Sequence, residues 1–588
     1  MHRRTFSRIG PKRAKFFFYV LLSLACYLAW RLLDVQTIHG PLYAKEALRQ
    51  RSDTVEIFAR RGSLLDRDGN VLVHSLPSES VYAVPHDLPD SQSAIARLQR
   101  AIGKIDPALE ALLRDRHLRF VWIARKVSPE IAARVQALAI PGIATIEEDT
   151  GRRVDLVGHS ASTVLGFVGI DENGLAGLEY TFDNLLRGSS GRVTMEADEF
   201  GRPIPFGRQR ILRTAKPGLT LELTIDSYLQ YVAENAIAQQ AKLYHARSAS
   251  AIVMDPRTGE VLALANVPSF DPNAYWKFAP EQRRDRAVED AYEPGSTFKL
   301  VTAAAALESG KVTTASRFAC RDTIEVGGRT LHNAEDGFLA GSGASETLED
   351  IIAYSHNVGA AEVGLTIGGK PFYAMETKAG FGAPTKIGLA GENPGIVPSP
   401  SQWSGSSLAT MAFGQGVSVT PLAMARFYAA IANGGLLIRP RILRAILDPQ
   451  GKTVYTYPPQ IERRIMSRRV AATLRRFLRS VVLRGTGDPT AQIQGYTTAG
   501  KTGTAQMVEN GEYEPGSYVA SFIGMVPYEH PRYLILVKVE RPIGAIYGSV
   551  VAAPAFAQIA KAAMIHAGVL PAASPPPRLV RSKAAAKR

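Results

Sequence analysis

The chain has 588 residues, of which 46% are hydrophobic and 21% charged, and this composition excludes a protein that is disordered throughout. Its length predicts more than one domain. Lysine and arginine outnumber aspartate and glutamate by 69 to 54, which suggests nucleic acid or an anionic membrane as a partner. The two cysteines, Cys26 and Cys320, are too few for a disulfide framework or a thiolate metal cluster. No grouping of cysteine with histidine in the sequence offers a metal site.

The N-terminus carries a membrane signal. Residues 1–15 are basic and contain no acidic side chain, and residues 16–30 contain no charge at all. Because the apolar stretch continues past Arg31 to Val35, we expect one transmembrane helix at 16–38. A cleaved signal peptide is the alternative, but no Ala-x-Ala site ends the stretch. Since positive charge stays inside, residues 1–15 should be cytoplasmic, and the chain after about residue 38 should be periplasmic, outside the inner membrane.

Residues 39–215 predict short strands and turns, interrupted by one helical stretch. Turn signals occur at Asp68-Gly69-Asn70, 171–174 and 200–203. We find no catalytic grouping in this segment. The sequence Ala215-Lys216-Pro217-Gly218 makes a plausible domain boundary.

The remainder of the chain predicts an α+β domain at 216–570. In chain order it shows a helix, two strands, a long helical insertion, three strands and a helix, which implies an antiparallel sheet faced by helices. The predicted elements outside the insertion are a helix at 226–245, strands at 249–254, 260–265, 496–508, 518–526 and 532–539, and a helix at 551–567. Residues 571–588, which are rich in proline and basic residues, predict a disordered tail.

The first motif is Ser296-Thr297-Phe298-Lys299, which opens an alanine-rich helix that stops at Gly310. Positions i and i+3 share a helix face, so the Lys299 amine can lie near the Ser296 hydroxyl and take its proton. The N–H groups at the helix N-terminus can stabilise an oxyanion. Alone, a Ser-x-x-Lys pattern is weak evidence, since chance produces it in a chain this long, but no other lysine here has a serine three residues before it.

The second motif, Ser355-His356-Asn357, follows a probable helix at 348–354. A hydroxyl and a carboxamide two residues apart can point into one cleft and there relay a proton and hold a peptide carbonyl. The alternative is an ordinary cluster of serine and asparagine at a helix end.

The third motif is Lys501-Thr502-Gly503-Thr504, on a predicted strand. There the lysine and the threonine hydroxyls would form a carboxylate-binding row, and Gly503 would let substrate approach the backbone closely. The same residues also satisfy the phosphate-loop pattern, which would indicate a nucleotide hydrolase. That pattern requires a helix after the lysine, whereas the sequence predicts a strand.

Together and in this order, the three motifs resemble those of the serine acyl transferases that react with penicillin. Over nearly its whole length the chain resembles a class B penicillin-binding protein, a monofunctional peptidoglycan D,D-transpeptidase. Residues 60–69 and 174–179 are similar to motifs of that family's pedestal domain, and 413–416 with Thr420-Pro421 to its transpeptidase domain. Residues 293–297 and the Lys-Thr-Gly form are closer to the division-site branch than to the elongation branch. One departure is 152–158, where the family usually has an Arg-x-Tyr-Pro-x-Gly stretch.

The resemblance implies a fold with one transmembrane helix, an elongated, mostly-β pedestal of the dimerisation type at 39–215 and a transpeptidase domain at 216–570. The transpeptidase domain should hold a five-stranded antiparallel sheet flanked by helices, plus an all-helical insertion.

The resemblance also implies a catalytic mechanism. Ser296, deprotonated by Lys299, attacks the carbonyl of a terminal D-Ala-D-Ala, and the backbone N–H groups of Ser296 and Thr504 form the oxyanion hole. Ser355 passes the proton to the departing D-Ala, and an amine from a neighbouring strand then resolves the acyl-enzyme. No cofactor and no metal is required.

The resemblance assigns substrate binding to the remaining motif residues. Asn357 would hold the peptide, and Lys501, Thr502 and Thr504, with Gly503 between them, would bind the terminal carboxylate. The implied ligands are peptidoglycan stem peptides and β-lactams. The implied partners are a membrane glycosyltransferase of the SEDS (FtsW/RodA-like) family and other division proteins.

Other readings remain open at this point. An elongation-type transpeptidase would share the motifs. So would a serine β-lactamase, but the glutamate and asparagine pair of class A enzymes is not visible, and a soluble β-lactamase would not need 39–215. A bifunctional synthase is disfavoured because no glycosyltransferase motif is evident. A non-catalytic division scaffold would not need Ser296 and Lys299.

The net charge now has an explanation. Six basic residues lie in the N-terminal leader and five in the tail. The charge therefore orients the chain in a membrane and no longer argues for nucleic acid.

Overall fold

The computed structural model describes residues 10–196, 209–333, 345–509 and 511–572. The described chain divides into two compact units. The first comprises the described residues of Met1–Ala59 and Ser189–Lys216, and the second those of Arg60–Gly188 and Pro217–Arg588. The predicted tail at 571–588 lies almost wholly outside the described residues, as do the first nine residues of the leader.

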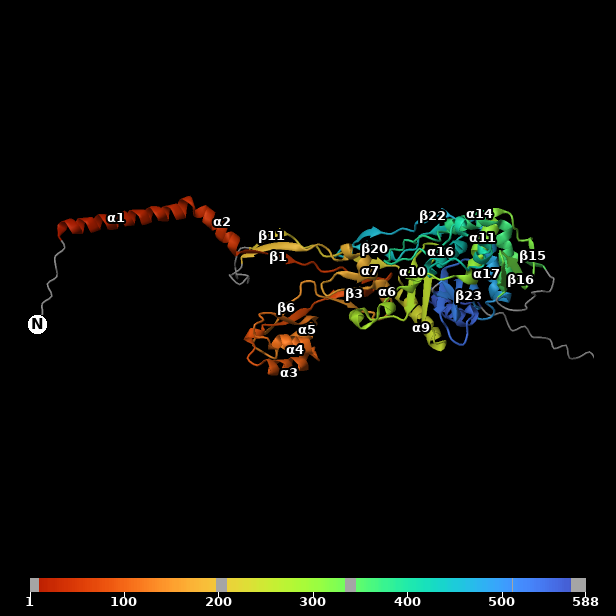
Figure 1. The fold of residues 1–588 in the computed structure, drawn as a ribbon, viewed down its shortest axis with the longest axis horizontal. Coiled ribbons are helices and arrows are strands. Elements are labelled where there is room, and N and C mark those ends of the chain that lie inside the picture. Colours follow the sequence, from red (N-terminus) through yellow and green to blue (C-terminus); the bar gives the residue numbers. More distant parts are fainter. Residues whose placement is uncertain (1–9, 197–208, 334–344, 510, 573–588) are drawn as a thin grey trace, which may run out of the picture. The chain divides into compact units, whose positions relative to one another are not determined.

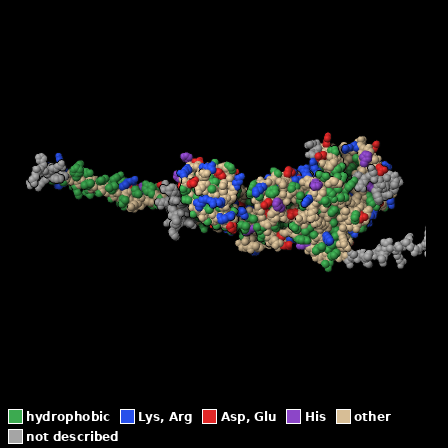
Figure 2. All heavy atoms as spheres, turned by 90° about the horizontal axis from the view of Figure 1, so that it is seen from below, with side chains coloured by type: hydrophobic (Ala, Val, Ile, Leu, Met, Phe, Trp, Pro, Cys, Tyr) green, Lys and Arg blue, Asp and Glu red, His purple; other side chains and the backbone are tan. Residues whose placement is uncertain are grey.

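The first unit begins with a long apolar helix, α1 (Pro11–Leu33), which continues as a π-helical turn, Asp34–Ile38. Together they span 28 residues, or about 42 Å at 1.5 Å per residue, and among the described residues this is the one helix long and apolar enough to cross a membrane. Figure 2 shows hydrophobic side chains over most of α1. The sequence predicted this helix, but it begins at Pro11 rather than 16, since proline is favoured in the first helical turn.

The same unit holds α2 (Gly40–Arg51) and a three-stranded antiparallel sheet. The sheet joins chain segments that are far apart in the sequence, because its central strand follows the first one only after more than a hundred residues. Its order is β1 (Ser52–Ile57), β10 (Gly191–Glu196), β11 (Gln209–Arg213).

In the second unit, a six-stranded sheet unites the pedestal segment with a distant part of the chain (Figure 1). The pairing of β12 with β2 is parallel, and the other pairs are antiparallel. Because β20 pairs with β12, residues beyond 440 complete a sheet that begins at Leu64. The strands, in sheet order, are β21 (Thr453–Thr456), β20 (Leu443–Leu447), β12 (Thr220–Leu223), β2 (Leu64–Leu65), β3 (Val71–Leu76) and β7 (Arg152–Asp155).

A three-stranded sheet, β5-β4-β6, packs with helices in the same segment. The sequence predicted one helical stretch in 39–215, and the structure corrects this, since three helices of eight or more residues form beside this sheet in addition to α2. Each starts at a signal that a single long helix would lack: Asp90 and Asp106 accept backbone N–H bonds, and Ser128 precedes Pro129. The elements are β4 (Glu79–Ala83), α3 (Ser91–Ile102), α4 (Pro107–Arg114), β5 (Val121–Val127), α5 (Pro129–Gln136) and β6 (Ile143–Glu147).

A buried ion network links the two sequence stretches that are similar to pedestal motifs. The Arg61 side chain is 1% exposed, and its guanidinium donates to Glu179 Oε2 (2.6 Å) and Asp183 Oδ1 (2.6 Å). Arg153, from the stretch that departs from the family pattern, donates to the other Glu179 oxygen at 2.7 Å. Nearby lie α6 (Ser162–Leu165), β8 (Phe167–Val168), β9 (Gly174–Ala176), α7 (Gly177–Thr181) and α8 (Asp183–Leu186).

The predicted five-stranded antiparallel sheet forms, in the order β14-β13-β25-β24-β23. Alternate residues of β13 face opposite sides: Ala251 and Val253 pack into the cluster that contains α9 and α19, whereas Ile252 and Met254 join the main core with α11 and α16. The elements are α9 (Ser227–Leu243), β13 (Ser248–Met254), β14 (Val261–Val267), β23 (Ala499–Glu509), β24 (Glu512–Val526), β25 (Tyr533–Glu540), α18 (Gly548–Val551) and α19 (Ala553–His566).

The insertion between β14 and β23 is helical, as predicted, but it also contains three small two-stranded sheets, so the prediction of an all-helical insertion was wrong. The strands are too short to give a clear alternation in the sequence. The helices are α10 (Arg286–Glu289), α11 (Lys299–Ser309), α12 (Leu348–Tyr354), α13 (Asn357–Ile367), α14 (Gly369–Ala379), α15 (Ser407–Met411), α16 (Pro421–Ala432) and α17 (Arg468–Arg484). The paired strands are β15 (Arg317–Ala319) with β18 (Ser345–Thr347), β16 (Thr323–Val326) with β17 (Arg329–His332), and β19 (Leu436–Ile438) with β22 (Ile461–Arg464).

Candidate active site

Ser296 lies in a 3₁₀ turn, Gly295–Phe298, that leads into α11. Gly295 has φ +52°, a conformation that glycine adopts at low cost. The backbone of Gly414 lies directly against it, with Gly295 N–H donating to Gly414 O at 3.1 Å, and a Cβ on Gly414 would lie 2.2 Å from Gly295 O. The Tyr428 hydroxyl donates to Thr297 O at 2.8 Å. These contacts fix the turn so that Ser296 lines a cleft.

Lys299 lies one helical turn after Ser296, and its side chain is buried. Its Nζ donates to Ser355 O, to Asn357 Oδ1 at 2.8 Å and, more weakly, to Ser355 Oγ at 3.3 Å. Burial, and then the nearby Lys501, hold the pKa of Lys299 well below its usual value. A neutral amine has two N–H bonds and one lone pair, so the two shorter contacts use both hydrogens and leave the lone pair available.

The Ser296 hydroxyl is not among the hydrogen-bond partners of Lys299 Nζ in the described part of the chain. The sequence placed these two groups within reach of each other, and the structure keeps them on one helix turn without a direct bond. Catalytic hydrogen bonds are often long before substrate binds, so this geometry does not disqualify Lys299 as a base.

Ser355 and Asn357 come from the turn between α12 and α13. Ser355 has φ +65°, a left-handed conformation that is uncommon outside glycine and that tends to occur at functional sites. This conformation ends α12. Asn357 is held by its own side chain, whose Nδ2 donates to His332 O at 3.1 Å, and by Asn333, whose Oδ1 accepts from Asn357 N–H at 2.8 Å.

Lys501 reaches the same serine from β23. Its Nζ donates to Ser355 Oγ at 2.9 Å and to Thr502 O at 3.3 Å, and the side chain is fully buried. Burial lowers the pKa of Lys501 from 10.5 to about 7. The two lysines therefore meet at one hydroxyl, Ser355 Oγ, where two neighbouring positive charges are unfavourable. This arrangement favours a neutral Lys299.

The strand that carries Lys501 excludes the phosphate-loop reading, because that loop must run into a helix and β23 continues to Glu509. Thr502 and Thr504 line the cleft. The Thr502 hydroxyl shares a hydrogen bond of 2.7 Å with Thr486, and the Thr504 hydroxyl accepts from Gly548 N–H at 3.3 Å.

Gly503 has a packing role that the sequence analysis did not predict. A Cβ at this position would lie 2.4 Å from Ser521 Oγ and 3.0 Å from Thr297 Cγ2. The glycine therefore lets β23 pack closely onto the turn that carries Ser296.

Several cleft residues escaped the sequence analysis. They lie far from the three motifs in the chain, and no local pattern marks them. They are Asn333, Thr486, Tyr547, Gly548 and Ser549.

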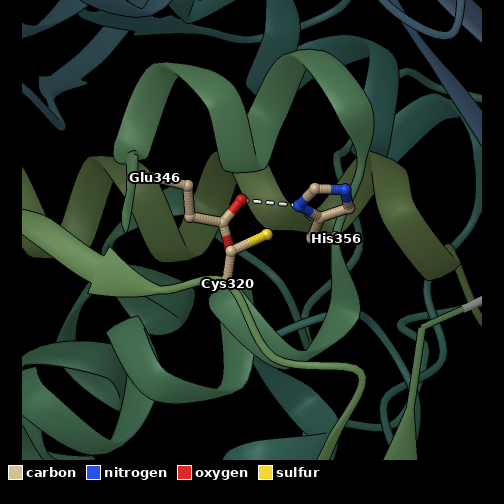
Figure 3. A group of neighbouring side chains, drawn as sticks. All are labelled: Cys320, Glu346 and His356. Atoms are coloured by element: carbon tan, nitrogen blue, oxygen red, sulfur yellow. Dashed lines mark hydrogen bonds and ion pairs between the residues drawn. The ribbon is translucent and has the colours of Figure 1, made fainter. Parts of the chain in front are cut away.

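The sequence analysis found no grouping of cysteine with histidine, and the fold corrects this. Cys320, Glu346 and His356 come together beside the cleft, with a ligand atom of each within 4.8 Å of the others (Figure 3). Since the three residues are separated by 26 and 10 positions in the chain, their spacing resembles no local metal motif.

Comparison with known proteins identifies the family. Residues 249–561 match the model of the penicillin binding protein transpeptidase domain, and residues 56–223 match that of the penicillin-binding protein dimerisation domain. Stage V sporulation protein D of Bacillus subtilis is 33% identical over 95% of this chain and 86% of its own length. Peptidoglycan D,D-transpeptidase FtsI of Escherichia coli is 31% identical over 92% of this chain and 89% of its own.

Solved structures that are similar to this chain belong to the same family. Penicillin binding protein 3 of Mycobacterium tuberculosis in complex with aztreonam has a TM-score of 0.68 and 30% identity, covering 89% of this chain and 99% of that chain. The same protein in complex with ampicillin also has a TM-score of 0.68. The chain therefore belongs to the class B penicillin-binding proteins, and it is an enzyme of their serine-type D,D-transpeptidase kind.

Proposed function

We propose that the chain cross-links peptidoglycan stem peptides through an acyl-enzyme on Ser296, and that β-lactams inhibit it by acylating the same serine. The observation that carries this proposal is the convergence of Ser296, Lys299, Ser355 and Lys501 from three distant chain segments. In that convergence, burial and the second lysine lower the pKa of Lys299 and so favour the neutral amine, which has a free lone pair.

Acylation begins when the Lys299 lone pair accepts the Ser296 proton and the serine oxygen attacks the carbonyl carbon of the penultimate D-Ala. The negative charge on the carbonyl oxygen is stabilised by the N–H groups of Ser296 and Thr504, and each such donor is worth about 3 kcal/mol. The C–N bond to the terminal D-Ala then breaks. The proton passes from Lys299 through the Ser355 hydroxyl to the departing amine. An amine of a second stem peptide attacks the ester, forms the cross-link and returns a proton to Ser296.

Substrate orientation comes from the opposite wall of the cleft. The Thr502 and Thr504 hydroxyls can donate to the terminal carboxylate, whose negative charge favours the protonated form of Lys501. The Asn357 amide is already bonded through Oδ1 to Lys299, and so it couples the peptide-binding side of the cleft to the base. Gly503 lets β23 pack against the turn of Ser296, and we propose that it also lets the substrate approach the backbone closely.

Labelling with fluorescent penicillin tests the proposal. The wild-type chain should be labelled covalently, and Ser296→Ala should abolish labelling. Ser309→Ala, at the exposed end of the same helix, is the matched control and should label normally. Absence of labelling in the wild type, or undiminished labelling of Ser296→Ala, would contradict the assignment. Hydrolysis of the acyl-enzyme within seconds would instead favour the β-lactamase alternative.

We further propose a septal role, which is supported by the similarity to FtsI and by the form of residues 293–297. Depletion of the protein should produce filamentous cells. Rounded cells would favour the elongation alternative, and normal growth with an inactive Ser296→Ala chain would favour a scaffold.

The proposed location is the inner membrane, with the N-terminus in the cytoplasm and the cleft in the periplasm. The basic leader before α1 supports this orientation. Protease added to intact spheroplasts should degrade the chain after α1. A SEDS-family glycosyltransferase is the expected partner, since the sequence shows no glycosyltransferase motif of its own, and it should co-purify with the full chain in mild detergent.

A further inference from the structure

A cluster of three metal-ligating side chains lies next to the cleft, and the proposed mechanism does not use it. Cys320 directly follows β15, and Glu346 lies on the paired strand β18, where it is opposite Phe318. His356 lies in the turn between α12 and α13. All three residues are less than 9% exposed. The β15–β18 sheet and the α12–α13 turn therefore bring a thiol, a carboxylate and an imidazole together at one buried point (Figure 3).

The geometry is close to that of a metal centre. His356 Nδ1 lies 2.5 Å from Glu346 Oε2, and the Cys320 sulfur points toward this pair, with all three ligand atoms within 4.8 Å of one another. Around a tetrahedral zinc ion, bonds of about 2.0–2.3 Å place neighbouring ligand atoms roughly 3.5 Å apart. To reach that spacing, the histidine nitrogen and the glutamate oxygen, which now share a hydrogen bond, would separate by about 1 Å, and the cysteine sulfur would move about 1 Å closer to them.

The chemistry of the donor set narrows the class of ion. A thiolate and an imidazole favour zinc and similar transition metals over magnesium or calcium, which prefer oxygen ligands. Three protein ligands leave one coordination position for water. We propose that Cys320, Glu346 and His356 bind one divalent transition-metal ion such as Zn²⁺. The thiol proton passes to the buffer when the sulfur binds the ion.

A metal ion at this position would stabilise the turn that carries the second motif. His356 is the middle residue of the second motif, between Ser355, which contacts both lysines, and Asn357, which contacts Lys299. An ion bound by His356 and by the β15–β18 sheet therefore ties that sheet to the turn that presents Ser355 and Asn357. It adds a positioning element to the second motif without contacting the substrate.

Cobalt titration of the full chain in detergent tests the proposal, because a cysteine thiolate bound to Co²⁺ gives a charge-transfer band in the near ultraviolet. We expect one equivalent of Co²⁺ to produce this band, and Zn²⁺ to displace it. Cys26→Ser, which removes the other cysteine, is the matched control and should keep the band. Cys320→Ser should lose it, and its Zn²⁺ affinity should fall by about a hundredfold or more. Glu346→Gln should also weaken Zn²⁺ binding.

A second measurement uses the wild-type chain, so that it does not depend on a variant that folds. Zn²⁺ at one equivalent should protect Cys320 from an alkylating reagent, with the modified residue identified by mass spectrometry. Either of two results would overturn the proposal: alkylation of Cys320 that is equally fast with and without Zn²⁺, or a thiolate band that survives in Cys320→Ser.

Discussion

The buried ammonium of Lys501 makes a strong prediction about stability as well as about activity. Replacing Lys501 by methionine keeps a long, unbranched side chain but removes the charge. Lowering the pKa of a lysine from 10.5 to about 7 by burial costs the folded state about 5 kcal/mol when the group is protonated. The variant loses the 2.9 Å bond to Ser355 Oγ, which costs about 2 kcal/mol. We therefore expect Lys501→Met to gain about 3 kcal/mol of unfolding free energy at pH 6.

The gain in unfolding free energy should become smaller as the pH rises. Between about pH 7 and pH 10.5 the unfolded chain still holds the Lys501 proton while the folded chain has released it, so the stability of the wild type rises with pH. At pH 10.5 the wild type no longer carries the buried charge. The advantage of the variant should then disappear, and the lost hydrogen bond should leave it about 2 kcal/mol less stable than the wild type.

Urea denaturation of the full chain in detergent, followed by tryptophan fluorescence at pH 6 and at pH 10.5, measures both values. Lys561→Met, at an exposed position on α19, is the matched control and should change stability by less than about 0.5 kcal/mol at either pH. A Lys501→Met chain that is less stable than wild type at pH 6, or equally stabilised at both pH values, would refute the reasoning. The same variant should label with penicillin about a hundredfold more slowly, because the cleft loses its positive charge.

Three further predictions concern other buried groups. Burial raises the pKa of Glu376 to about 8, and its carboxylate oxygens have no hydrogen-bond partner among the described residues. Glu376→Gln should therefore gain up to about 5 kcal/mol of unfolding free energy at pH 9, measured by urea denaturation. At pH 5 the gain should be small, because the folded chain keeps the proton on Glu376. Gly414→Ala would place a Cβ 2.2 Å from Gly295 O and displace the adjacent nucleophile, so stopped-flow acylation by penicillin should slow by about a hundredfold. Glu179→Gln removes a buried partner of Arg61 and should cost about 3 kcal/mol, seen as a lower melting temperature, whereas an unchanged melting temperature would contradict the importance of this pair.

The sequence predicted those parts of the site that local patterns encode. The helix period places Lys299 one turn after Ser296, and strand alternation and turn residues predicted the five-stranded sheet, including the strand that carries Lys501. The helix turn and each single strand depend on residues within about fifteen positions of one another, where propensity and periodicity act directly, although the pairing of these strands joins distant segments.

The remaining features depend on contacts between distant segments, which no local pattern reports. The sequence did not predict the packing at Gly503, where a Cβ would meet Ser521 and Thr297, which come from two other elements. The cluster of Cys320, Glu346 and His356 depends on how β15 and β18 pair in front of the α12–α13 turn. The helices between 91 and 136 were underestimated because their starting signals are spaced closely enough to be mistaken for turns.

The pairing of β12 with β2 also determines how the chain can be divided for study. A fragment that begins at residue 216 would lack β2, β3 and β7, so the backbone of β12 that faces β2 would be left without its partner. An exposed strand edge of this kind invites association with other chains. A soluble fragment should therefore start before Arg60, just ahead of the second compact unit. During synthesis the sheet also stays incomplete until residue 456 has been made, which makes folding of this unit a late event with long-range closure.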